Sequence, residues 1–278
     1  MKKGKLILFP VPIGADEIGA SLPALNQELL ATCRTFIVEE LRTARRFLKH
    51  AGYPHPIDDT VFLELNEHTM RQVESGKRKV ESEERRTENG ERRTENGERR
   101  TCCRTRKFSI LSSPFSTYLD AIDRGENIGL LSEAGLPCVA DPGAIIARMA
   151  QERGIEVVPL VGPSSLMLAL MASGLNGQSF AFNGYLPVDR SQRAAAIRRL
   201  EERALREHQT QLFIEAPYRN NQMLETLCAT LKPHTMVCVA CDLTLPTQYI
   251  RTMTSGKWKE EKTKIDLHKR NTVFLIGR

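Results

Sequence analysis

Short apolar runs alternate with longer amphipathic or charged segments along most of the chain. The runs at residues 5–9, 128–131 and 155–160 are too short for helical periodicity, and each leads into a stretch rich in Gly, Pro or Ser. Such runs are typical of strands that are buried on both faces of a parallel sheet. The amphipathic segments between them predict helices, so the pattern as a whole predicts an α/β fold.

The same pattern predicts the remaining elements. A helix is expected to begin after a cap at Ser21, with Leu22, Leu25, Leu29 and Leu30 on its apolar face. Residues 248–253 and 272–276 alternate in polarity, which predicts two antiparallel strands that pair with each other. Further strands are expected at 35–38, 210–214 and 236–241, and further helices at 145–153, 192–208 and 220–231.

Residues 128–143 form the clearest candidate for a ligand site. The apolar run is followed by a loop in which Gly135 allows a sharp turn and leaves room for a ligand against bare main chain. Asp141 is then a good helix N-cap, and Pro142 suits the first helical position. A loop between a buried strand and a helix N-terminus predicts a site at the carboxyl edge of the sheet. The alternative interpretation is an ordinary connection between a strand and a helix.

A heptapeptide repeat interrupts this α/β pattern. Residues 84–101 read E-R-R-T-E-N-G twice and then E-R-R-T, without apolar positions at coiled-coil spacing and with Asn-Gly, which breaks helices. We therefore interpret residues 72–110 as a disordered insertion. A cationic arm that contacts RNA is the alternative. Residues 76–107 contain twelve Lys/Arg and seven Glu, so they carry +5 of the net charge of +6, and the rest of the chain offers little basic surface.

The remaining composition excludes several classes of protein. No apolar run approaches the ~20 residues of a membrane helix, so no membrane association is expected. The seven cysteines are an odd number in mostly apolar surroundings, which predicts reduced thiols in the cytoplasm. Cys238 and Cys241 form a C-x-x-C pair, but within a strand their side chains would point to opposite faces. We therefore expect no metal site.

Six short motifs, in the same order along the chain, resemble those of the tetrapyrrole methylase superfamily. The central motif, S-E-A-G-L-P-C-V-A-D-P-G, is similar to the superfamily signature S-D-A-G-x-P-x-x-x-D-P-G. P-V-P-I-G at residues 10–14 resembles P-T-P-I-G, and V-G-P-S-S at 161–165 resembles P-G-P-S-A. E-E-L-R-T at 39–43, Y-L-P at 185–187 and E-A-P-Y-R at 215–219 resemble A-E-D-T-R-x-T, F-L-P and E-S-P-H-R. The closest resemblance is to the small-subunit (16S) ribosomal RNA cytidine 2'-O-methyltransferases.

This resemblance implies a fold, a methyl donor and a donor site. It implies two α/β domains, at residues 1–160 and 161–278. The first would have a parallel sheet with helices on both faces, and the second a mixed sheet. The donor would be S-adenosylmethionine, bound in the cleft between the domains, and the family generally forms homodimers. The expected donor-binding residues all follow predicted strands of the first domain: Pro12, Gly14, Glu133, Ala134, Gly135, Asp141, Ser164 and Ser165. A simple helix N-cap is the alternative role of the serine at the start of the helix that follows V-G-P-S-S.

The acceptor implied by the resemblance is a ribose hydroxyl in ribosomal RNA or the small ribosomal subunit. Glu215, Arg219 and Arg42 are the candidate catalytic residues, because the guanidinium of arginine suits a phosphate-flanked ribose and a carboxylate could polarise a weakly acidic hydroxyl. An ion pair between Glu215 and Arg219, four residues apart, is the alternative role. The sequence departs from this ribosomal RNA family at Glu40, Leu41, Leu136 and Tyr218. It also departs at Cys241 and Leu245, because C-D-L-T-L at residues 241–245 stands where the family has R-E-L-T-K.

Two other functions remain open at this point. One is methylation of a small tetrapyrrole or corrin precursor on the same fold. The other is a protein that binds S-adenosylmethionine but has lost catalysis, which the departures from the motifs and the repeat insertion would explain. A nicotinamide dehydrogenase is disfavoured, because no G-x-G-x-x-G follows the first strand.

Overall fold

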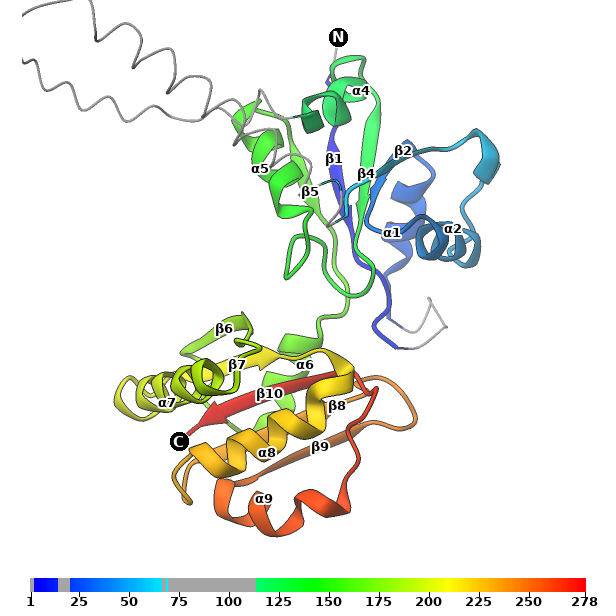
Figure 1. Ribbon diagram of the computed structural model, residues 1–278. Helices are drawn as coiled ribbons and strands as arrows, with labels where there is room; N and C mark the ends of the chain where they lie inside the picture. Colours follow the sequence, from blue (N-terminus) through cyan, green and yellow to red (C-terminus); the bar gives the residue numbers. More distant parts are fainter. Residues whose placement is uncertain (1–2, 15–20, 67–68, 70–113) are drawn as a thin grey trace, which may run out of the picture. The chain divides into compact units, whose positions relative to one another are not determined.

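The computed structural model describes residues 3–14, 21–66, 69 and 114–278 (Figure 1). The expected disordered insertion at 72–110 therefore lies outside the described residues. The described residues form two compact units, the first within Met1–Val11 and Leu22–Gly162 and the second within Pro12–Ser21 and Pro163–Arg278. No helix in the described part of the chain is long and apolar enough to cross a membrane.

The first unit contains a five-stranded parallel sheet with the order β3-β2-β4-β1-β5, as the apolar runs predicted. The central strands β1, β2 and β4 are mostly buried, as expected of apolar strands between two helical layers, whereas the residues of the edge strands β3 and β5 are exposed or half-buried. Figure 1 shows α1 and α2 on one side of the sheet and α5 on the other. The strands are β1 (Leu6–Phe9), β2 (Cys33–Val38), β3 (Val61–Glu64), β4 (Asn127–Leu131) and β5 (Val157–Pro159).

The helices of the first unit are short and connect successive parallel strands. Ile146 and Met149 of α5 are fully buried against Leu6, Ile128 and Leu130 of the sheet. Gly154 ends this connection with a left-handed φ of 64°, as expected of a glycine after a helix. The helices are α1 (Ala24–Leu30), α2 (Leu41–His50), α4 (Asp120–Asp123) and α5 (Ala144–Glu152), with 3-10 turns η2 (Ile57–Asp59) and η4 (Pro114–Leu119).

The second unit contains a five-stranded mixed sheet with the order β6-β7-β10-β8-β9. β6 and β7 are parallel, and the other neighbours are antiparallel. The strands are β6 (Phe180–Tyr185), β7 (Thr210–Ile214), β8 (Met236–Cys241), β9 (Tyr249–Thr254) and β10 (Thr272–Gly277). The two sheets confirm the predicted α/β fold, in which a parallel sheet is followed along the chain by a mixed one.

Two separate cores cover the faces of this mixed sheet. Helices α7 (Arg190–Arg206), α8 (Asn220–Thr230) and α9 (Ser255–Glu261) pack on the face that contains Phe213 and Phe274. Helix α6 (Ser165–Ser173) packs on the opposite face. Cys241 belongs to the first core and Cys238 to the second, so the prediction that these thiols point to opposite faces is confirmed. Two 3-10 turns complete the unit, η5 (Pro217–Arg219) and η6 (Lys262–Lys264).

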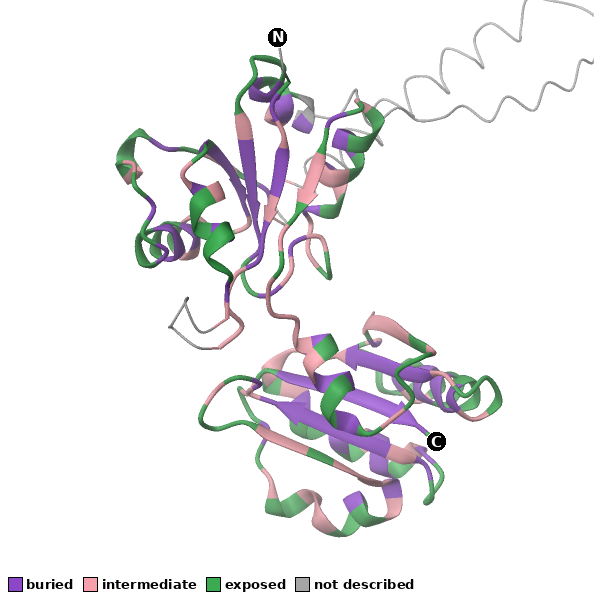
Figure 2. Ribbon diagram, turned by 180° about the vertical axis from the view of Figure 1, so that it is seen from behind, coloured by how far each residue is buried: buried purple, intermediate pink, exposed green. Residues whose placement is uncertain are grey.

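The expected pairing of the last two strands was wrong. β8 lies between β9 and β10, so residues 249–254 and 272–277 do not contact each other as neighbours. The reason is burial: all six residues of β10 are buried, whereas those of β9 are exposed or half-buried. Figure 2 shows this contrast within the sheet. A strand that is apolar on both sides occupies the centre of a sheet, and a strand with polar positions occupies its edge.

The first helix also differs from its prediction. It begins at Ala24 after Pro23, and Ser21 does not cap it. Leu25 is 55% exposed, whereas Asn26 is buried because its side-chain amide donates a hydrogen bond to the carbonyl oxygen of Val161. A long-range hydrogen bond therefore decides which face of α1 is buried, and the spacing of apolar residues could not predict it.

Gly129 generates a prediction about the centre of the parallel sheet. A Cβ at this position of β4 would lie 2.4 and 2.5 Å from two ring carbons of Phe36 and 3.1 Å from Phe9. Gly129→Ala should therefore lower the free energy of unfolding by about 1–3 kcal/mol through overpacking. Urea unfolding measures this loss. Gly177→Ala is the control, because nothing lies within 4 Å of that Cβ; equal midpoints for the two variants would contradict the prediction.

Candidate functional site

The loops after β1 and β4 are joined by backbone hydrogen bonds at the carboxyl edge of the first sheet. The N–H of Val11 donates to the carbonyl oxygen of Gly135 at 2.9 Å, and the N–H of Gly135 donates back to Val11 at 2.9 Å. The hydroxyl of Ser132 also donates to the Gly135 carbonyl, at 2.8 Å. Gly135 has a φ of 78°, which disfavours any residue with a Cβ. Pro12 directly follows this bridge.

The predicted donor residues of the β4 loop differ in exposure. Glu133 and Ala134 are exposed, whereas Gly135 is buried. The loop therefore presents a carboxylate and a small side chain at the surface, and its backbone is fixed from below by the bridge to Val11. A site for a polar ligand needs this combination of a rigid main chain and a few accessible polar groups.

Asp141 was predicted to be a helix N-cap, but in the structure it closes a turn that precedes the helix. Helix α5 begins at Ala144, and Gly143 is its N-cap. The Oδ1 atom of Asp141 accepts hydrogen bonds from the N–H of Gly143 at 2.6 Å and from that of Cys138 at 3.3 Å. An aspartate that bonds the N–H two residues ahead forms a local turn, so the helix starts later than the predicted cap. The turn also contains Cys138 and Ala140 with left-handed φ values of 67° and 56°.

A cavity adjoins Asp141 between the ends of β2 and β4 and the start of α5. Its volume is about 10 Å³, and its lining includes Glu39, Asp141 and Gly143. This volume suits about one water molecule and no larger ligand. Asp141 therefore has a demonstrated role in shaping the loop, and its predicted role as a donor contact stays a prediction.

Arg42 lies in the first turn of α2, directly after β2. Both carboxylate oxygens of Glu40 accept backbone hydrogen bonds, from the N–H of Arg42 at 3.0 Å and from that of Thr43 at 2.6 Å. These bonds lower the pKa of Glu40, because they stabilise its charged form. Glu40 is therefore the N-cap of α2. The side chain of Arg42 is exposed.

Ser164 and Ser165 begin helix α6 in the second unit. The hydroxyl of Ser164 accepts a hydrogen bond from the N–H of Met167 at 3.4 Å, so Ser164 is the N-cap, one of the two roles that the sequence left open. The first N–H groups of a helix have no partner within the helix, and the positive end of its dipole favours an anion. The start of α6 can therefore hold an anionic group such as a carboxylate.

Gly14 packs against the loop that follows β8 in the same unit. A Cβ on Gly14 would lie 2.8 Å from the Cγ of Leu245, 3.0 Å from the carbonyl oxygen of Leu243 and 3.1 Å from the hydroxyl of Thr244. Gly14 thus allows the two backbones to approach closely. Leu245, which stands where the resemblance would have lysine, belongs to this contact.

Glu215 and Arg219 form an ion pair at the carboxyl end of β7. Arg219 Nη2 donates to Glu215 Oε1 at 2.5 Å, and the N–H of Ala216 donates to the same oxygen at 2.8 Å. The Glu215 side chain is fully buried and that of Arg219 is 17% exposed. The ion pair that the spacing of four residues suggested is therefore present. Among the described residues, Glu215 Oε2 and Arg219 Nε are buried without a hydrogen-bond partner.

Tyr218 is the exposed member of this turn. Its side chain is 65% exposed, and the guanidinium carbon of Arg219 lies 5.6 Å from the centre of its ring. The buried carboxylate of Glu215 thus fixes the guanidinium, and the guanidinium lies beside an accessible aromatic face. An aromatic ring next to a fixed arginine can stack on a planar ligand and bind a phosphate.

The chain matches the sequence model of the family described as tetrapyrrole (corrin/porphyrin) methylases over residues 27–258. Because this match covers most of the chain, the protein belongs to that family. A solved structure titled as that of the methyltransferase CobJ has the same fold, with a TM-score of 0.55 and 14% identity over 99% of this chain and 94% of that one.

Curated relatives are similar to parts of the chain. The protein named Ribosomal RNA small subunit methyltransferase I from Escherichia coli O157:H7 is 38% identical over 128 residues, which are 46% of this chain and 43% of that protein. The protein of the same name from Mesorhizobium japonicum is 32% identical over 157 residues, 56% and 52% of the two chains. The chain thus spans about half the length of the curated relatives it matches. The family model confirms the resemblance of the motifs to the tetrapyrrole methylases, and the curated relatives confirm a similarity to ribosomal RNA methyltransferases over part of the chain.

Asp141 generates a prediction about pH. Burial raises the pKa of its carboxyl, so the folded protein binds this proton more tightly than the unfolded chain, and stability falls as the pH rises through the raised pKa. Asp141→Asn keeps an acceptor oxygen and removes the charge. The free energy of unfolding at pH 7 should therefore rise, and the gain should vanish below about pH 3.9, the ordinary pKa of aspartate.

Asp141→Ala is the matched variant for the two hydrogen bonds. It removes the acceptor for Cys138 and Gly143, so the free energy of unfolding should fall by about 1–2 kcal/mol. Urea unfolding at pH 7 and pH 3 measures both variants. Equal stability of the Asn and Ala variants at pH 7 would show that the side-chain acceptor oxygen at position 141 does not hold the turn.

Proposed function

We propose that this protein is an S-adenosylmethionine-dependent methyltransferase that methylates a ribose 2'-hydroxyl in small-subunit ribosomal RNA. The similarity to relatives named Ribosomal RNA small subunit methyltransferase I carries the choice of RNA. The fixed Arg219 beside the exposed Tyr218 supports it, because this pair suits a phosphate-flanked nucleotide. The proposal includes a homodimer, which light scattering of the purified protein tests. It also includes a location in the cytoplasm.

The donor residues fit the chemistry of S-adenosylmethionine. Its amino acid end has a carboxylate, which the N–H groups at the start of α6 suit, and its hydroxyl and ammonium groups suit the exposed carboxylate of Glu133. The buried Gly135 fixes this loop through its bridge to Val11, so the exposed residues that precede it keep a defined geometry. Pro12, Gly14, Ala134, Asp141 and Ser165 complete the proposed donor-binding set.

Catalysis on this chain is mainly a matter of alignment. S-adenosylmethionine supplies an activated methyl group that leaves a sulfonium by in-line displacement. The protein has to hold the acceptor hydroxyl in line and exclude water. Arg219 and Arg42 would hold the charged backbone of the acceptor, and Glu215 would keep Arg219 in position or, through its buried second oxygen, polarise the hydroxyl.

The donor loop yields a prediction with a matched control. Gly135→Val should weaken S-adenosylmethionine binding about 10-fold or more, or about 1.4 kcal/mol, because a side chain would fill the space beside the main chain and strain a φ of 78°. Gly52→Val carries a comparable strain, with a φ of 69°, at a position with nothing within 4 Å. Calorimetry on both folded variants separates ligand contact from strain. Equal affinities would remove the β4 loop from the donor site.

The acceptor residues yield a second prediction. Arg219→Ala should lower the rate of RNA methylation about 100-fold, or about 2.7 kcal/mol, and leave donor affinity within about twofold, because the acceptor and the donor lie on opposite sides of the transferred methyl group. Arg206→Ala is the control, since Arg206 is an exposed arginine with an ion pair to Glu202 in the same unit. A parallel loss in both variants would contradict a specific role for Arg219.

The proposed function is tested by mapping methylated riboses in ribosomal RNA from cells with and without the gene. One ribose methyl group should disappear when the gene is deleted and return with the parent gene but not with Arg219→Ala. Purified corrin precursors are assayed in parallel with small subunits stripped of this modification. Methylation of the corrin alone would replace the proposal with the tetrapyrrole alternative, and donor binding without any methylation would support loss of catalysis.

A further inference from the structure

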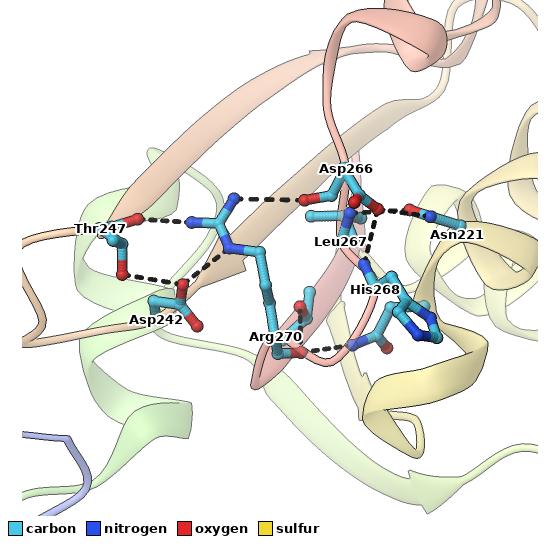
Figure 3. Close-up of polar contacts among 9 residues, drawn as sticks. Asn221, Asp242, Thr247, Asp266, Leu267, His268 and Arg270 are labelled. Carbon is cyan, nitrogen blue, oxygen red and sulfur yellow. Dashed lines mark hydrogen bonds and ion pairs between the residues drawn. The ribbon is translucent and has the colours of Figure 1, made fainter.

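Arg270 joins three segments of the second unit, immediately before the central strand β10. Its Nε donates to Oδ2 of Asp242 at 2.7 Å, one terminal nitrogen donates to the carbonyl oxygen of Thr247, and the other donates to that of Asp266 at 3.4 Å (Figure 3). The side chain of Arg270 is 24% exposed and that of Asp242 is 11% exposed. Every nitrogen of the guanidinium is therefore engaged within the protein, so Arg270 connects segments and is not free to bind a ligand.

The loop after β8 has a backbone that needs such a restraint. Asp242 and Thr244 have left-handed φ values of 49° and 72°, although neither is glycine. Strained residues of this kind persist only where the surrounding contacts determine them, and they cluster at functional sites. Here Thr247 donates its hydroxyl to Asp242 at 3.0 Å, and the N–H of Leu245 donates to the Asp242 carbonyl at 3.0 Å. Asp242 thus accepts hydrogen bonds from within the loop, and its carboxylate also pairs with Arg270, which lies outside the loop.

This loop is also the surface on which Gly14 lies. Leu243, Thr244 and Leu245 all approach the position where a Cβ of Gly14 would be, at 2.8–3.1 Å. A change in the loop would therefore displace the turn after β1, which belongs to the proposed donor site. The contacts of Asp242 therefore fix Gly14, a predicted donor residue, through the neighbouring residues of the loop that pack on it.

The segment that carries Arg270 also fixes the turn at Glu215–Arg219. The N–H of Lys269 donates to the carbonyl oxygen of Pro217 at 3.0 Å, inside this turn. The side chain of Asn220, which is fully buried, donates to the carbonyl oxygen of Arg270 at 2.6 Å. Asn221 binds the same segment from the next position, as Figure 3 shows, through Asp266 and Leu267. The segment at 266–270 therefore lies between the loops that follow β7 and β8 and bonds to both.

We infer that Arg270 is a positioning residue for methyl transfer. Its guanidinium holds the loop at 242–248 directly and ties it to the segment at 266–270, whose backbone bonds to the turn at 215–219 and to Asn220. Through this connection the Gly14 turn and the Arg219 guanidinium keep their places relative to each other within the second unit. This inference rests on the proposed function. A purely structural ion pair would contribute to the stability of the unit and nothing else.

The test compares Arg270→Met with a matched structural variant, Glu201→Met. Glu201 is also buried in the second unit, where it accepts hydrogen bonds from the N–H of Lys232 at 2.8 Å and the hydroxyl of Thr235 at 2.5 Å. None of these three residues belongs to either loop. Urea unfolding, RNA methylation and amide hydrogen exchange are measured on the full-length variants, with Arg270→Lys as the conservative replacement.

Both Met variants should lower the unfolding midpoint, but only Arg270→Met should lower kcat, by about 10-fold or more, at RNA concentrations above KM. Amide exchange at Leu245 and Arg219, whose N–H groups bond to Asp242 and Ala216, should become at least about 10-fold faster in Arg270→Met alone. Arg270→Lys should restore only part of the rate, because an ammonium lacks the planar fork that reaches three acceptors.

Two results would overturn the inference. One is a loss of activity in both Met variants in proportion to their loss of stability. The other is unchanged amide exchange at Leu245 and Arg219 in Arg270→Met. The exchange measurement needs no substrate, so it decides whether Arg270 holds the two loops even if the parent protein does not methylate RNA. That outcome would contradict the proposed function separately.

Discussion

The parallel pairing of β1 with β4 is the constraint on which the candidate donor site depends. Phe9 and Leu131 are the last paired residues, and two further hydrogen bonds between Val11 and Gly135 continue the contact past the strand ends. Parallel strands leave their carboxyl ends at one edge, so loops more than a hundred residues apart in the chain lie side by side there. The rigidity of this edge comes from backbone bonds, and its chemistry comes from the few side chains that the loops expose.

The second unit joins its loops through both backbone groups and side chains. Its loops follow β7 and β8, which are separated by β10, so no backbone bridge between the two strands can join them. The segment before β10 occupies this gap, and its polar groups bond to both loops. Buried polar networks of this kind are costly when partly satisfied, because each unpaired group loses its bonds to water. The full engagement of Arg270 therefore indicates a geometry that the fold has to keep.

Several departures from the family motifs have a physical explanation in the structure. Glu40 caps α2 with both carboxylate oxygens. Cys241 is fully buried in the core beneath α8 and α9, and burial raises the pKa of its thiol to about 11. Leu245 packs on Gly14, and Tyr218 lies beside the guanidinium of Arg219. Each of these side chains suits its position, so these departures are as compatible with a changed acceptor contact as with lost function. Leu41 and Leu136 have no such explanation here.

The sequence by itself determined the elements whose signals are local. The apolar runs located β7 and β8 to the residue. The place of Ser164 before an apolar helix and the four-residue spacing of Glu215 and Arg219 each gave the observed cap or ion pair as one of two open roles. Tertiary structure decided the burial of Asn26, the central place of β10, the turn at Asp141 and the connections of Arg270. Periodicity reports which face of an element is apolar, but partners far apart in the chain compete for each position, and that competition is resolved only when the whole unit packs.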